Sequence, residues 1–194
     1  MNPSNRERLL AAATEVFLEH GYAASVDMLV ARAGVARQTF YNHFENKECL
    51  FAEAMRNCVS DILVPLSDQS GDLRENLKRF GRTYRQRVLS PQSIAKFRIV
   101  TGQAQRFPEL TGEDYALGLG KMVSCLAEFL GAAMAQGRMR DADPAFAAEM
   151  LLSMLAGLER TRLLFGVTTP HQDEELQVER IVDGFMRMFA VGQE

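Results

Sequence analysis

Apolar residues recur every three or four positions along almost the whole chain, and this spacing limits the fold more than any other feature of the sequence. In the first such segment, Leu9, Ala13, Val16 and Phe17 fall on one face of a helix. The regular alternation of apolar and polar residues that is typical of strands is almost absent. The sequence therefore predicts an all-α protein of about nine helices.

Glycine, proline and capping residues divide this pattern into helices. Gly21 ends the first helix, and Asn46 can cap a fourth helix that we expect to continue until Pro65 interrupts it. Asp72 with Glu75 forms a capping box for the fifth helix. Further helices are expected over about 91–106, 113–136 and 144–165, with a last one from 169 or 173 almost to the C-terminus.

Two short helices, at about 25–33 and 37–44, are separated by a turn at Gly34. Such a pair is typical of a helix-turn-helix, whose second helix enters the DNA major groove. Phe40 and Phe44 can face the core, which leaves the polar side chains outside. Arginine and glutamine can read guanine and adenine, hydroxyls suit phosphates, and a lysine beside unpaired helix N–H groups can clamp a phosphate. The predicted DNA-binding residues are Ser25, Arg37, Gln38, Thr39, Tyr41, His43 and Lys47.

Residues 6–51 resemble the DNA-binding domain of the TetR family of regulators. The resemblance rests on Ala11-Ala12, Phe17, Gly21-Tyr22, Ala33-Gly34-Val35, Thr39-Phe40-Tyr41, His43-Phe44 and Asn46-Lys47-Glu48. It implies dimeric binding to operator DNA, controlled by a ligand in the C-terminal body; residues from about 106 to 166 are more loosely similar to the family's variable ligand-binding domains. The expected domains are therefore 1–50, for DNA binding, and 51–194, for ligand binding and dimerisation.

Two positions depart from the family pattern. Val30 stands where a small alanine is usual, which would hold the two short helices slightly further apart. Ala36 stands where a serine often caps the recognition helix, and losing such a cap costs about 0.5–2 kcal/mol.

Charge alone does not indicate a nucleic-acid partner. The net charge is −3, and residues 1–50 contain five basic and six acidic side chains. DNA binding would therefore depend on where a few donors point. No run reaches the roughly 18 uninterrupted apolar residues of a membrane helix, and the N-terminus lacks the apolar core of a signal peptide. We expect a cytoplasmic protein with no membrane partner.

The segment 144–165 is apolar around nearly its whole circumference, so both of its sides should be buried. In a chain of this size one side can face the core and the other a second subunit; a core entirely within one chain is the alternative. The final helix carries a broad apolar stripe, with Gly184 allowing close approach. The two helices predict an isologous four-helix dimer interface. Its candidate residues are Met154, Leu158, Phe165, Ile181, Phe185 and Met188.

Aromatic and methionine side chains of the middle helices could line an adaptable apolar pocket, although any single side chain of this kind more often belongs to the core. A polar contact is expected from Tyr84, Arg98 or Tyr115. The predicted pocket residues are Tyr84, Phe97, Arg98, Phe107, Tyr115, Met122, Phe129 and Met150. One face of the fifth helix carries a basic stripe, which is either solvated or faces an anionic ligand or acidic partner. The stripe consists of Arg74, Lys78, Arg82 and Arg85.

These features favour a ligand-responsive repressor that binds a palindromic operator as a homodimer and is released by a small, mainly apolar effector. A helical protein–protein interaction module without DNA binding is the alternative. Enzyme function is not predicted, because metal-ligand spacings, H-E-x-x-H, G-x-S-x-G and phosphate-loop motifs are absent from the sequence. We predict no catalytic residue, metal or cofactor.

Overall fold

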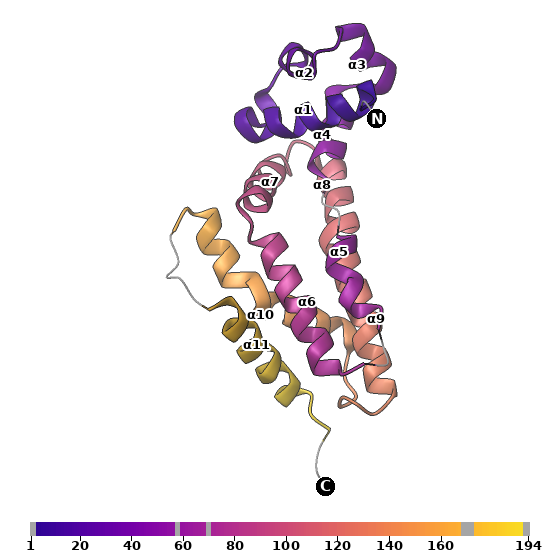
Figure 1. The fold of residues 1–194 in the computed structure, drawn as a ribbon, viewed down its shortest axis with the longest axis vertical. Coiled ribbons are helices and arrows are strands. Elements are labelled where there is room, and N and C mark those ends of the chain that lie inside the picture. The colour runs from indigo at the N-terminus through magenta and orange to yellow at the C-terminus, as the bar shows by residue number, and fades with distance from the viewer. Residues whose placement is uncertain (1–2, 57–58, 69–70, 168–172, 192–194) are drawn as a thin grey trace. The chain divides into compact units, whose positions relative to one another are not determined.

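The computed structural model describes residues 3–56, 59–68, 71–167 and 173–191, and within these ranges the regular structure is entirely helical (Figure 1). The helices are α1 (Asn5–His20), α2 (Val26–Ala33), α3 (Arg37–His43), α4 (Lys47–Met55), α5 (Ser60–Leu63), α6 (Leu73–Val88), α7 (Pro91–Gly102), α8 (Pro108–Tyr115), α9 (Lys121–Ala135), α10 (Pro144–Leu164) and α11 (Glu174–Met188). A π-helical turn, Ala116–Gly120, joins α8 to α9. The all-α prediction is confirmed.

The chain divides into two compact units. Unit 1 comprises Met1–Asn57 and Ala95–Leu117, and unit 2 comprises Cys58–Ile94 and Gly118–Glu194. They differ from the predicted domains, 1–50 and 51–194, because the segment Ala95–Leu117 packs with the N-terminal helices. That segment includes most of α7 and all of α8, which sequence spacing placed with the C-terminal body.

In unit 1, α1 packs against both α2 and α4, and α3 contacts α1 and α2. Leu9, Phe17, Leu29, Phe40 and Leu50 are completely buried, one or two from each of these four helices. Burying a side chain of this size stabilises the fold by about 1.5–3 kcal/mol. The helices of the helix-turn-helix therefore share one core with α4.

Local hydrogen bonds fix the ends of the short helices. Ser25 caps α2 by accepting from the Met28 amide, whereas Ala36 gives α3 no side-chain cap, as the sequence predicts. Gly34 ends α2 in the left-handed conformation, with φ of 64°. The Arg8 guanidinium donates to the carbonyls of Ala33 and Gly34 at 2.8 and 2.9 Å. A residue on α1 thus holds the turn between the two helices, a role that the sequence pattern did not indicate.

The fourth helix is shorter than expected. It ends at Met55, because the backbone of Arg56 is extended (φ −54°, ψ 127°), and α5 begins only at Ser60. Residues 57 and 58 lie outside the described part of the chain. The Ala54 carbonyl accepts from Thr14 Oγ1 at 3.3 Å and from Lys96 Nζ at 3.1 Å. The prediction of one continuous helix to Pro65 was therefore wrong.

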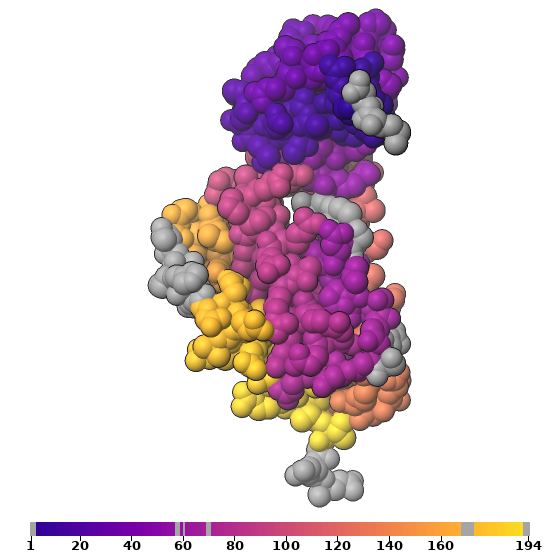
Figure 2. All heavy atoms as spheres, in the orientation of Figure 1, coloured from indigo at the N-terminus to yellow at the C-terminus, as the bar shows by residue number. Residues whose placement is uncertain are grey.

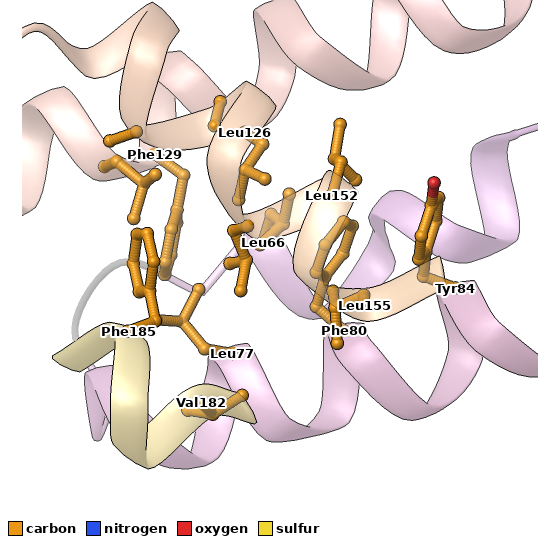
Figure 3. Packing of buried hydrophobic residues seen from close by; sticks show 14 of the residues in the cluster. Leu66, Leu77, Phe80, Tyr84, Leu126, Phe129, Leu152, Leu155, Val182 and Phe185 are labelled. Carbon is orange, nitrogen blue, oxygen red and sulfur yellow. The ribbon is translucent and has the colours of Figure 1, made fainter. Parts of the chain in front are cut away.

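Unit 2 is a helical bundle around a single apolar core. Figure 3 shows side chains of α6, α9, α10 and α11 meeting in it, among them Leu77, Leu126, Leu155 and Phe185, all completely buried. Helix α10 packs chiefly against α9. Helix α11 packs chiefly against α6, and Figure 2 shows these two helices side by side.

The basic stripe of α6 faces the acidic side of α11. Lys78 pairs with Glu179 at 3.2 Å, and Arg82 pairs with Glu175 at 2.7 Å. At the ends of the row, Arg74 pairs with Asp183 and Arg85 with Glu174. The acids that face this stripe therefore belong to a helix of the same chain, about a hundred residues away.

Candidate nucleic-acid interface and nearby pocket

The exposed face of α3 is the strongest candidate for DNA contact. Phe40 is completely buried and orients the helix, while Tyr41 is 47% exposed. Arg37, Gln38, Asn42 and His43 are also exposed, and Thr39 is half-buried. The predicted α3 set thus shares one short helix, and Asn42 joins it. The i, i+4 spacing from Gln38 could have pointed to Asn42.

Two of the predicted base readers already have protein partners. Arg37 pairs with Asp27 of α2 at 2.9 Å, and Gln38 Nε2 donates to Asn42 Oδ1 at 3.2 Å. Both pairs lie at the surface, so exchanging them for base edges costs little.

Lys47 points into the protein. Its Nζ donates to the carbonyls of Tyr22 and Ala24 at 3.0 and 3.2 Å and lies 4.1 Å from the centre of the Tyr22 ring. Two of its three N–H bonds are therefore used to hold the turn before α2 against the start of α4. The sequence predicted a phosphate clamp; the geometry adds a structural role that leaves one donor for a phosphate.

Replacing Lys47 with methionine should therefore lower the free energy of unfolding, by about 1.5–3 kcal/mol for the lost hydrogen bonds of a charged donor. Operator affinity should fall as well. Denaturant titration and a salt series of DNA-binding measurements would separate the two effects. If Lys47 only contacted a phosphate, its replacement would make the salt dependence of DNA binding shallower by about one unit and leave the free energy of unfolding unchanged. Lys47→Arg, which keeps the charge, is the matched control.

Tyr22 lies at the centre of an aromatic and charged cluster in unit 1. It is 6% exposed, and its hydroxyl donates to the Glu48 carboxylate. Burial, together with Glu48, raises the pKa of the Tyr22 hydroxyl, and the same hydrogen bond lowers the pKa of Glu48. The rings of Phe51 and Phe107 lie 5.1 and 4.8 Å from the Tyr22 ring. Helix α4 and the start of α8 thus both contact the helix-turn-helix through one side chain.

Beside this cluster lies a small pocket, between α4, α7 and α8. Its lining is apolar apart from one hydroxyl and one carboxylate. The lining residues are Phe51, Ala52, Met55, Val100, Phe107, Leu110, Thr111 and Asp114.

The predicted pocket residues are distributed over both units. Phe97, Arg98, Phe107 and Tyr115 belong to unit 1, where Phe107 lines the pocket, Arg98 is exposed and Tyr115 is 58% exposed. Tyr84, Met122, Phe129 and Met150 belong to unit 2.

Three of these unit 2 residues fill its core: the exposed fractions of Tyr84, Met122 and Phe129 are 2, 4 and 2%. Figure 3 shows Tyr84 and Phe129 within this packing. These three residues therefore belong to the core, as the alternative interpretation has it, because a close-packed interior leaves no space beside a buried ring for a ligand.

The predicted interface residues are exposed to very different extents. Leu158, Phe165 and Met188 are 65, 81 and 45% exposed, and Met154 and Ile181 are half-buried. Phe185 is completely buried and contacts Phe189, with ring centres 4.8 Å apart. Phe185 is therefore a core residue of this chain and cannot contact a second one.

A recognition helix that presents Arg37, Gln38 and Tyr41, carried on an all-helical body, defines a helix-turn-helix transcriptional regulator. Residues 9–54 match the description "Bacterial regulatory proteins, tetR family", and residues 75–191 match "AefR-like transcriptional repressor, C-terminal domain". The chain belongs to the TetR family, whose members bind DNA, typically dimerise through the C-terminal domain and are not enzymes.

Similar proteins agree with this assignment. A TetR-family regulator from Mesorhizobium loti MAFF303099 has a TM-score of 0.84 at 23% identity, over 96% of this chain and 97% of the other. The flavonoid-responsive regulator FrrA has a TM-score of 0.75 at 28% identity, over 95% of this chain and 96% of the other. The repressor DhaR of Mycobacterium sp. (strain GP1) is 38% identical over 68 residues, which is 34% of each chain. The match thus spans about a third of DhaR.

One helical stretch, Pro108–Ala135, is long and apolar enough to cross a membrane by length and composition alone. Its most apolar window has a mean hydropathy of 1.4 and is 39% buried. Leu126, Phe129 and Leu130 of this stretch are buried in the core of unit 2. Since the TetR family consists of soluble regulators, we interpret the stretch as a core helix.

Proposed function

We propose that the protein is a cytoplasmic repressor that binds a palindromic operator as a homodimer and releases it when a small, mainly apolar effector binds. The observation that carries the DNA-binding part is the exposed face of α3, where Arg37, Gln38 and Tyr41 surround a buried Phe40. The match of residues 75–191 to an AefR-like repressor domain supports repression over activation.

The dimer is supported by apolar side chains left uncovered on α10 and α11. Leu158 and Phe165 lie on α10 or at its end, about two turns apart, and Met188 lies near the end of α11. Gly157 and Gly184, both without a side chain, would allow two copies of these helices to approach closely. Isolated exposed apolar residues are common on proteins, but two large ones as exposed as Leu158 and Phe165, two turns apart on one helix face, are typical of an interface.

The class of effector is supported by the unit 1 pocket and by one similar structure. Six of the eight lining residues are apolar, and FrrA is described as flavonoid-responsive. We propose an uncharged molecule with a mainly apolar body. It would bind the free protein more tightly than the operator complex, typically by 5–150-fold for a coupled pair of sites.

The test of DNA recognition is selection of bound fragments from random genomic DNA with the purified full-length protein. The enriched sequences should contain an approximate palindrome. Gln38→Ala should relax discrimination at one base pair in each half-site by about 1–3 kcal/mol. Gln92→Ala, at an exposed glutamine of α7, is the matched control and should change nothing. A protein that enriches no sequence would instead fit the interaction-module alternative.

A further inference from the structure

One side of the unit 1 pocket is more deeply buried than the other. Phe51, Met55 and Val100 are 3, 1 and 8% exposed, so α4 and α7 supply a buried floor. Phe107 and Leu110, from the start of α8, are only half-buried. A water-sized sphere can occupy about 10 Å³ of the pocket as it stands, enough for one water molecule. A larger occupant must therefore displace the α8 side chains.

Asp114 supplies a hydrogen-bond acceptor to this otherwise apolar site. Its Oδ1 is buried and lacks a hydrogen-bond partner among the described residues. Burial raises the pKa of this carboxyl group, although the charges of Lys96 and Arg56 act in the opposite direction. Lys96 Nζ is already bonded to the Ala54 carbonyl. An unpaired buried oxygen costs about 1–3 kcal/mol, which a ligand that donates a hydrogen bond would recover.

Two walls of the pocket also contact the helix-turn-helix. Phe51 and Phe107 both touch Tyr22, and the backbone carbonyl of Tyr22 accepts from Lys47. Lys47 in turn holds the carbonyl of Ala24, directly before the cap of α2. All of these residues lie within unit 1. A movement of Phe107 therefore reaches the start of α2 through two side chains.

We propose that this pocket binds an uncharged, mainly apolar molecule through a hydroxyl donor to Asp114, and that the displaced Phe107 transmits binding to Tyr22. This inference rests on the proposed function and adds the site, the chemical group that is recognised and the route of the response. A carboxylate ligand is excluded by the same geometry, because its charge would face the buried Asp114 oxygen.

The test uses 4-ethylphenol as the probe and 4-ethylanisole, which lacks the donor, as its matched partner. The full-length protein carries ¹³C-labelled methionine methyls and 3-fluorotyrosine, and no DNA is present. Titration with 4-ethylphenol should shift the Met55 methyl signal saturably, with 4-ethylanisole at least about tenfold weaker, the value of a hydrogen bond to a charged acceptor. Asp114→Leu should lower the affinity for 4-ethylphenol to the same extent, whereas Glu113→Leu, at an exposed neighbour, should leave that affinity unchanged.

The transmission step has its own readout. The Tyr22 fluorine signal should shift on saturation with 4-ethylphenol. Phe107→Leu keeps the lining apolar but removes the ring contact, so the Met55 shift should persist while the Tyr22 shift falls. Equal affinity for the two probes, or an unchanged Asp114→Leu titration, would overturn the binding site. A Tyr22 signal that does not respond would overturn the route. Neither result would alter operator selection, so failure here is distinct from failure of the proposed function.

Discussion

Leu158→Glu is expected to convert the homodimer into a folded monomer that has lost high-affinity operator binding. Leu158 is 65% exposed in the single chain, so a charge there costs the fold little. In an isologous interface the same change occurs twice, and each carboxylate would be buried without a partner at a cost of several kcal/mol. A monomer engages one half-site instead of two, so DNA affinity should fall by orders of magnitude.

Analytical ultracentrifugation and operator titration would test this, with circular dichroism to confirm folding. Val64→Glu is the matched control, because Val64 is also 65% exposed in unit 2 but lies outside α10 and α11. Phe185→Glu should behave differently and unfold the chain, since Phe185 is completely buried. If Leu158→Glu sediments as a dimer with unchanged operator affinity, the interface lies elsewhere.

The second large effect is expected at Arg85, whose side chain is 3% exposed. Its guanidinium donates to the Leu155 carbonyl, to Glu159 at 2.7 Å and to Glu174 at 2.8 Å. Arg85→Ala would leave the Leu155 carbonyl buried and the Glu159 carboxylate without its partner. Breaking a buried pair in this way costs about 3–5 kcal/mol of stability.

Denaturant unfolding at a fixed protomer concentration would measure this loss, since a dimer's stability depends on concentration. Arg82→Ala is the matched control from the same stripe. Its side chain is 35% exposed and its partner Glu175 is 70% exposed, so its removal should cost only about 0–1 kcal/mol. Equal losses for the two variants would show that the burial of Arg85 contributes nothing.

The helix-turn-helix could be predicted because its signals are local. The caps, the turn at Gly34 and the burial of Phe40 all follow from residues within a few positions of one another. Lys47 could not be assigned in the same way, because the carbonyls that it binds lie 23 and 25 residues earlier. Helical spacing identifies the face on which a side chain lies but not its partner across a tertiary contact.

The C-terminal body was harder to predict for a related reason. Periodicity places Phe185 and Met188 within one broad apolar stripe, yet packing buries the first and leaves the second 45% exposed. Tyr84 and Phe129 are side chains of the kind that line apolar pockets, yet both are packed in the core of unit 2. Composition does not distinguish these uses, because the same side chains serve both.

The four cations of α6 pair with the acids of α11 in reverse order along the chain. All four ion pairs can form in only one register of the two helices. If α11 slid by a single turn, about 5.4 Å, in one direction, Arg187 would stand opposite Arg74 and two cations would repel. Slipping the other way would carry Glu175 past Arg82 and leave that cation unmatched. Helix α6 has no part in the proposed interface. Its ion pairs nevertheless fix the position of α11 along the bundle, and therefore where Ile181 and Met188 would contact a second copy.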